Sequence, residues 1–100
     1  MHLIYDNLRT IAALCRKYKV SKLYVFGSVL TSKFNEDSDI DFLFDFCPEI
    51  NYNNYSDNYF DLWEALKNLF GREVDLVDEK TLHNPIFIKE IEATKQLIYG

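Results

Sequence analysis

Apolar side chains recur along the chain at regular spacings, and these spacings predict the first helix and strands. Between residues 3 and 18 the apolar positions lie three or four residues apart, which is the stripe of an amphipathic helix. Residues 22–26 and 39–46 are short segments rich in β-branched and aromatic side chains, as is typical of buried strands. The first of these strands ends at Gly27 and Ser28, where we expect a tight turn.

A second apolar stripe predicts a helix in the middle of the chain. Its apolar positions are Phe60, Trp63, Leu66, Leu69 and Phe70. Ser56 or Asp57 can cap its start, and Gly71 stands where a left-handed C-terminal cap is expected. The polar and aromatic stretch 51–59 lacks sustained periodicity, so we expect a loop there. We expect its tyrosines at positions 52, 55 and 59 to be solvated; the alternative is that they stack on a base or contact a partner protein.

The last third of the chain contains one more strand and one more helix. Residues 73–78 alternate charged and apolar side chains, which predicts a short strand. Asn84 and Pro85 provide an N-cap and a first-turn proline for a helix that we expect to run to about Ile98. The order helix, strand, strand, helix, strand, helix predicts an α+β fold, in which a small mixed sheet is covered by helices.

Composition and charge restrict the number of domains and the partners. With 100 residues, 48% of them hydrophobic, the chain can bury one core, so we expect a single domain over residues 1–100. The net charge of −5 disfavours direct binding to a nucleic-acid backbone. No apolar run approaches the roughly 18 residues of a membrane span. Isolated cysteines at positions 15 and 47, without a recognisable leader segment, favour the cytoplasm.

The segment GSVLTSKFNEDSDID combines a glycine and a serine with two later aspartates. Gly27 lets the backbone approach a phosphate closely, and the Ser28 hydroxyl and nearby amides can donate to phosphate oxygens. Asp39 and Asp41 are two apart on a predicted strand, so both point to one face and can converge on metal ions. Asp75 on a later strand could complete a two-metal site that prefers Mg²⁺.

An Asp-x-Asp pair alone decides little, because such pairs commonly end a strand at the surface. With this chain's own composition, the full pattern of Gly-Ser, ten residues and Asp-x-Asp has a chance probability on the order of 10⁻³. The combination, rather than the pair, is therefore the signal.

On these residues the sequence resembles the minimal nucleotidyltransferase (MNT) family of the DNA-polymerase-beta-like superfamily. The family pattern is Gly-Ser, ten residues, Asp-x-Asp and a later Asp. The likeness also includes KLYVFGS, DIDFLFDF, GREVDLVD and the closing IEATKQLIYG, and so extends over nearly the whole chain.

The resemblance implies a function for each of these residues. Gly27 and Ser28 would hold the triphosphate of ATP. Asp39 and Asp41 would bind two Mg²⁺ ions, and Asp75 would ligate the catalytic metal and activate the attacking hydroxyl. The transferred group would be AMP. Many family members carry basic residues directly after Gly-Ser, whereas this chain has Val29, Leu30 and Thr31. Triphosphate binding would then depend on Lys33 or Arg72.

The resemblance also implies a partner. Our first hypothesis is an antitoxin of the MntA type, which in its family neutralises a HEPN-domain ribonuclease toxin by AMPylating it. The size of the chain is compatible with this reading, because 100 residues leave little room for a second domain that binds a small acceptor. The alternative is a catalytically weak module that neutralises its toxin by stoichiometric contact. An RNA nucleotidyltransferase is disfavoured by the acidic charge, and homo-oligomerisation stays open.

Overall fold

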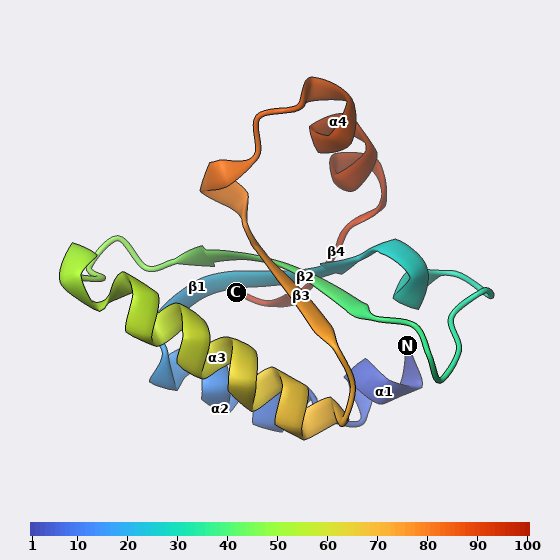
Figure 1. The fold of residues 1–100 in the computed structure, drawn as a ribbon, viewed down its shortest axis with the longest axis horizontal. Helices are drawn as coiled ribbons and strands as arrows, with labels where there is room; N and C mark the ends of the chain where they lie inside the picture. The colour runs from blue at the N-terminus through green and yellow to red at the C-terminus, as the bar shows by residue number, and fades with distance from the viewer.

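A four-stranded mixed sheet with helices on both faces forms the molecule (Figure 1). The computed structural model describes all 100 residues. The strands are β1 (Val20–Phe26), β2 (Ile40–Phe46), β3 (Val74–Asp78) and β4 (Gln96–Tyr99). The helices are α1 (His2–Tyr5), α2 (Leu8–Lys17), α3 (Tyr55–Phe70) and α4 (Pro85–Thr94), and 3-10 turns lie at η1 (Gly27–Leu30), η2 (Tyr52–Asn54) and η3 (Glu79–Thr81). The predicted α+β fold is confirmed.

The sheet has the order β3-β2-β1-β4, with β2 and β1 at its centre. Strand β2 pairs parallel with β3, whereas β1 pairs antiparallel with both β2 and β4. Figure 1 shows α2 and α3 along one face of the sheet and α4 over the other. Because β1 and β2 are antiparallel, the C-terminal end of β1 lies beside the N-terminal end of β2, between the helical layers.

Two groups of buried apolar residues hold the layers together. The larger group comprises 16 residues and lies between the sheet and the helices α2 and α3. Phe42 and Phe44 of β2 are fully buried in it, and the ring of Phe42 stacks on Phe70 at a centroid distance of 6.0 Å. The smaller group, Phe26, Leu43 and Ile91, lies between the sheet and α4. The alternation along β2 thus directs successive side chains into the two groups.

The first predicted helix is broken in two. Residues 3–18 were expected to form one helix, but α1 ends at Tyr5 and α2 begins at Leu8. Asn7 stands at the break, where its side-chain amide donates to the carbonyl of Leu3 at 2.7 Å. A short polar side chain that bonds to the local backbone competes with helical hydrogen bonding, which the apolar stripe alone does not reveal.

The prediction of a helix up to Ile98 is wrong at its C-terminal end. Helix α4 begins as predicted, because the Asn84 side chain accepts hydrogen bonds from two first-turn amides and Pro85 follows it. It ends at Thr94, however, and the next residues form β4, which pairs with β1. The pairing covers one edge of β1, a tertiary contact that overrides the helical spacing of the sequence.

The predicted loop at 51–59 is also wrong in part, because α3 already begins at Tyr55 with Asn54 rather than Ser56 or Asp57 as its N-cap. Gly71 adopts the predicted left-handed conformation at φ 63°. Tyr52 is exposed as expected, whereas the side chains of Tyr55 and Tyr59 are partly buried. The tyrosines at 55 and 59 therefore belong to the structured body of the protein.

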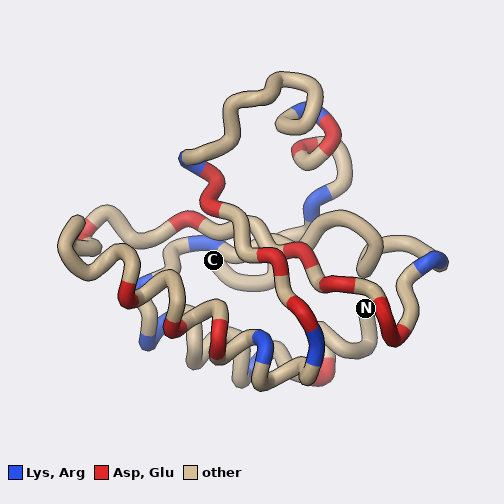
Figure 2. The backbone as a smooth tube through the Cα atoms, viewed as in Figure 1, with Lys and Arg blue, Asp and Glu red and all other residues tan.

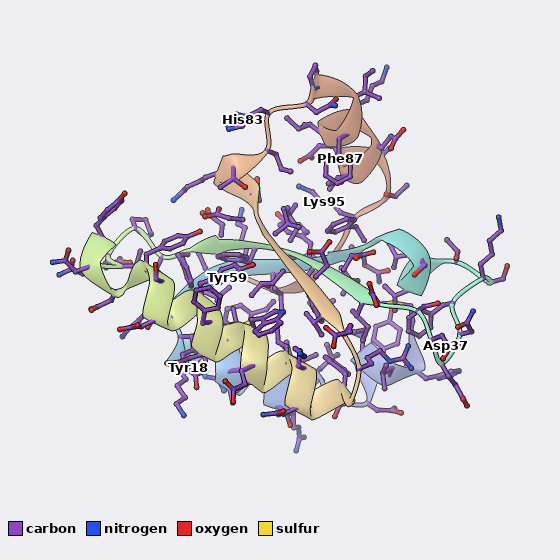
Figure 3. The ribbon with its side chains drawn as sticks, in the orientation of Figure 1. Tyr18, Asp37, Tyr59, His83, Phe87 and Lys95 are labelled. Atoms are coloured by element: carbon purple, nitrogen blue, oxygen red, sulfur yellow. The ribbon has the colours of Figure 1, made fainter.

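Aromatic side chains of α3 satisfy the free edge of β3. The Tyr59 hydroxyl donates to the carbonyl of Leu76 at 2.5 Å, and the Trp63 indole N–H donates to the carbonyl of Val74 at 2.9 Å. Figure 3 shows Tyr59 pointing from α3 towards the sheet. Because these carbonyls lie on the edge away from β2, the bonds cover acceptors that another strand could otherwise use.

Candidate active site

Two of the three predicted carboxylates lie side by side on the central parallel strands. Asp41 of β2 and Asp75 of β3 are register partners, and neighbouring strands are about 4.8 Å apart. The adjacent residues Phe42 and Leu76 are buried under the α2 and α3 layer, so strand alternation turns both carboxylates to the opposite face. Figure 2 shows acidic positions close together on these two strands.

The third carboxylate, Asp39, lies one residue before β2 and is exposed. Its spacing of two residues from Asp41 is the spacing at which strand side chains share a face. Asp39 is also close enough to Asp41 to act on it electrostatically, because its negative charge contributes to raising the Asp41 pKa. The chain therefore brings Asp39, Asp41 and Asp75 into one acidic group.

Charge repulsion and burial combine at Asp41. Burial is the larger cause, followed by the negative charges of Asp75 and then Asp39, and together they raise the Asp41 pKa from 3.8 to about 6. None of the three salt bridges of the protein involves these residues. An anionic group of this kind, without a protein cation as counter-charge, is suited to a divalent cation.

Gly27 packs directly against the acidic group. Strand β1 ends at Phe26, which is the register partner of Asp41, and the chain then turns at Gly27 with φ 74°. A Cβ atom at this position would collide with the Asp41 Oδ2. Both the backbone conformation and the close approach therefore require glycine. Ser28, the next residue, is partly exposed at the start of η1.

The three residues after Ser28 have different environments. Val29 is 2% exposed and belongs to the larger core, and Leu30 packs against that core. Thr31 is exposed, and its hydroxyl donates to the carbonyl of Ser28 at 2.9 Å, which closes the turn. A charged side chain at position 29 would have to be buried, at a considerable free-energy cost.

The two basic residues considered for triphosphate binding have different environments. Lys33 is exposed in the loop that follows η1 and takes part in no salt bridge. Arg72 donates from Nη1 to the carbonyls of Asn35 and Ser38, both at 2.9 Å, and its guanidinium lies 4.7 Å from the Phe34 ring centroid. Of the two, only Lys33 has its cationic group uncommitted.

The donor set fits a metal that is shared between protein and substrate. No group of three or more His, Cys, Asp and Glu side chains is arranged to hold a metal ion by itself. Mg²⁺ is commonly bound by one or two carboxylates together with substrate phosphates and water. Asp39, Asp41 and Asp75 supply carboxylates of this kind beside Gly27, whose missing side chain allows the Asp41 carboxylate to pack against the turn.

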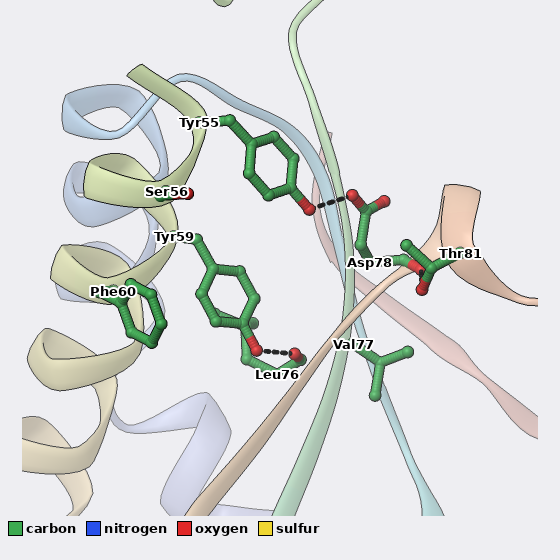
Figure 4. A pocket seen from close by; sticks show the side chains of 8 residues that line it. All are labelled: Tyr55, Ser56, Tyr59, Phe60, Leu76, Val77, Asp78 and Thr81. Atoms are coloured by element: carbon green, nitrogen blue, oxygen red, sulfur yellow. Dashed lines mark hydrogen bonds between the residues drawn. The ribbon is translucent and has the colours of Figure 1, made fainter. Parts of the chain in front are cut away.

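A separate cavity of about 430 Å³ lies along α3 and the free edge of β3 (Figure 4). Tyr55, Tyr59 and Phe60 line one side, with Val77 and Thr81 across from them. No predicted site residue lines it. The sequence did not indicate this cavity, because Tyr55 and Tyr59 were expected in a loop.

Asp78 belongs to this second region rather than to the acidic group. It lies at opposite parity to Asp75 on β3, as its spacing predicts, and is buried. Its carboxylate accepts hydrogen bonds from the Tyr55 hydroxyl and the Lys80 amide. The bond to Asp78 and burial both raise the Tyr55 pKa, with burial the larger cause. Asp78 therefore connects α3, β3 and η3.

The chain belongs to the polymerase beta nucleotidyltransferase family, whose model matches residues 9–100. Two relatives from Methanocaldococcus jannaschii are named "Putative protein adenylyltransferase", MJ1379 and MJ0128. They are 42% and 39% identical to this chain over 83 residues, which is 83% of this chain and 79% of each relative.

Three solved structures have folds similar to that of this chain. One, described as a "putative minimal nucleotidyltransferase", has a TM-score of 0.76 at 28% identity, over 96% of this chain and 95% of that one. Another, described as a toxin-antitoxin with AMP-PNP, has a TM-score of 0.71 at 22% identity, over 94% and 73%. A Shewanella oneidensis complex of a tri-AMPylated HEPN toxin with an MNT antitoxin has a TM-score of 0.65 at 20% identity, over 96% and 71%. The last two likenesses concern the fold.

No helix is both long enough and sufficiently apolar to cross a membrane.

Proposed function

We propose that this protein is a Mg²⁺-dependent adenylyltransferase that moves AMP from ATP to a hydroxyl group of a partner protein. The observation that carries the proposal is the pairing of Asp41 with Asp75 on one face of the sheet, directly beside the turn at Gly27. Acidic groups next to a glycine turn can bind the metal ions and the phosphates of one nucleotide.

In the proposed reaction the acceptor oxygen attacks the α-phosphorus of ATP. The bond from the α-phosphorus to the bridging oxygen breaks, and pyrophosphate leaves. Asp75 accepts the hydroxyl proton, directly or through water, because its carboxylate is exposed and lies on the same face of the sheet as Asp41. Asp39 and Asp41 would hold two Mg²⁺ ions with Asp75 as a further ligand. When bound, the ions would neutralise charge on the phosphates and the leaving group.

Gly27 and Ser28 hold the triphosphate in this proposal. The glycine turn allows the backbone to approach phosphate, and Ser28 supplies a partly exposed hydroxyl. Lys33 is the proposed cationic contact, because Val29 is buried and Arg72 already donates to two carbonyls. A single flexible lysine would bind the triphosphate more weakly than a fixed pair of cations.

The proposed acceptor is a HEPN-domain toxin, and the protein would be its antitoxin in the cytoplasm. Two lines of evidence support this. The relatives at 42% and 39% identity are named as protein adenylyltransferases, and one structural neighbour is an MNT antitoxin in complex with a tri-AMPylated HEPN toxin. Both cysteines are free thiols, as expected in a reducing compartment.

A binding module without efficient catalysis is the second candidate. It is favoured by the apolar residues at positions 29 and 30, which leave η1 without a cation. In that case the protein would inhibit the toxin by contact alone, and the acidic group would have little influence on inhibition.

Transfer of a labelled phosphate separates the two candidates. The protein is incubated with Mg²⁺, the product of the adjacent gene and ATP labelled at either the α- or the γ-phosphate. We expect the α-label on the partner and the γ-label in pyrophosphate. Asp39→Asn and Asp41→Asn should abolish transfer, whereas the exposed control Asp61→Asn on α3 should retain it. Absence of label, with equal inhibition of the partner by the wild type and both site variants, would establish the binding module instead.

A further inference from the structure

Arg72 makes contacts that tie together two separate parts of the acidic site. It lies in the turn between α3 and β3, three residues before Asp75. From there its Nη1 reaches back 34 and 37 residues to the carbonyls of Ser38 and Asn35, at 2.9 Å each. The guanidinium also lies over the ring of Phe34, 4.7 Å from its centroid.

The loop that Arg72 contacts is otherwise closed mainly by bonds within itself. The Asn35 amide donates to the Ser38 hydroxyl at 3.1 Å, and the Ser38 amide donates to the Asn35 carbonyl at 3.1 Å. The Asp37 amide donates to the Asn35 side chain at 2.8 Å. These bonds shape the turn but do not fix it to the sheet. Two contacts attach the loop to the rest of the protein: Phe34 packs against the larger core, and the Arg72 side chain donates to the Asn35 and Ser38 carbonyls.

The bond from Arg72 to the Ser38 carbonyl lies directly before Asp39 in the chain. Asp39 lies just outside β2 and is held from both sides: the following peptide group is bonded to the sheet, because the Ile40 amide donates to the Glu73 carbonyl at 3.2 Å, and the preceding peptide group carries the Ser38 carbonyl that accepts from Arg72. We propose that Arg72 is a positioning residue, which fixes residues 35–38 and thereby places the Asp39 carboxylate beside Asp41. The catalytic part of this inference rests on the proposed adenylyl transfer.

Arg72 is better suited to this task than to binding triphosphate. Its two carbonyl bonds are charge-assisted, and its guanidinium lies over an aromatic ring, a combination that the single ammonium group of a lysine reproduces less well. Nη1 is committed to the loop, and the guanidinium lies over Phe34, so the group is not free to reach a triphosphate. We therefore expect substitution to affect the order of the loop and the chemical step more than the affinity for ATP.

The experiment compares Arg72→Leu and Arg72→Lys with Arg9→Leu, a matched control in which an exposed arginine of α2 loses the same charge. Backbone order parameters of the metal-free protein report directly on the loop. For residues 35–39 we expect about 0.85 in the wild type and the control, falling below about 0.6 in Arg72→Leu. Arg72→Lys keeps the charge and the aliphatic stem, and should give intermediate values even if the leucine variant does not fold.

Steady-state transfer gives the second measurement. We expect kcat to fall by about 10²-fold in Arg72→Leu, as for an ångström-scale misplacement, while KM for ATP stays close to the wild-type value. Unchanged order parameters in both Arg72 variants would overturn the proposal, as would a loss of activity that lies only in KM. If the wild type transfers no AMP, the proposed function fails, and the order parameters still decide whether Arg72 fixes the loop.

Discussion

Replacing Asp41 by asparagine should make the metal-free protein more stable at neutral pH. In the folded chain Asp41 is partly buried next to Asp75 and Asp39, and these surroundings raise its pKa from 3.8 to about 6. A shift of this size would correspond to about 3 kcal/mol for a fully desolvated group. Because the side chain is only partly buried, solvent screening reduces the expected gain to about 1 kcal/mol. For a 100-residue domain that is a rise in Tm of roughly 4–8 °C.

The pH dependence gives this prediction a defined sign. The folded protein binds the Asp41 proton more tightly than the unfolded chain does. The favourable contribution of protonated Asp41 to the free energy of unfolding is therefore complete below pH 3.8 and is lost as the pH rises through about 6. The advantage of Asp41→Asn over the wild type should therefore be near zero below pH 4 and reach its full size by pH 7.

The assay is thermal and urea denaturation in EDTA from pH 4 to pH 8. Asp61→Asn is the control, because Asp61 is exposed on α3 and should change stability by less than about 0.5 kcal/mol at any pH. Equal stability of the Asp41→Asn variant and the wild type at pH 7, or a gain of the same size at pH 4, would refute the reasoning. Mg²⁺ with ATP should raise the Tm of the wild type and have a smaller effect on the variant.

Three further predictions concern the turn, the sheet edge and the thiols. Gly27→Ala should lower the free energy of unfolding by about 1–3 kcal/mol, because φ is 74° and the added Cβ meets a carboxylate; unchanged urea midpoints would contradict it. Tyr59→Phe should cost about 1–2 kcal/mol through the lost bond to the β3 backbone, and a neutral result in the same assay would show that the bond contributes nothing. Burial raises the pKa of the Cys15 thiol to about 12, so a thiol reagent should modify partly exposed Cys47 in the native protein and Cys15 only in denaturant; rapid native modification of both would disprove it.

The main elements of the fold were predictable because their patterns are local. Two apolar stripes and three short apolar runs located α2, α3 and the first three strands, and Gly71 and Asn84 marked helix ends through their own backbone preferences. Strand β4 was missed because its four residues are defined by pairing with β1, across more than 70 positions. The break at Asn7 was missed because one side-chain bond decides it.

The candidate site was predictable in its residue types and spacing, but not in its electrostatic environment. Strand periodicity placed Asp39 and Asp41 together, whereas the pairing of Asp41 with Asp75 depends on the parallel register of β2 and β3. The attachment of Arg72 to the loop before Asp39 could not be read from a sequence, because its acceptors are backbone carbonyls, which every residue carries.

Intact-mass analysis of the partner protein tests the central claim most directly. The purified product of the adjacent gene is incubated with ATP, Mg²⁺ and either the wild-type protein or Asp41→Asn, and its mass is then measured. We predict mass increases of whole AMP units with the wild type, none with the variant and none when EDTA replaces Mg²⁺. If the wild-type protein forms a complex with the partner but leaves its mass unchanged, the assignment of Asp39, Asp41 and Asp75 to adenylyl transfer is contradicted.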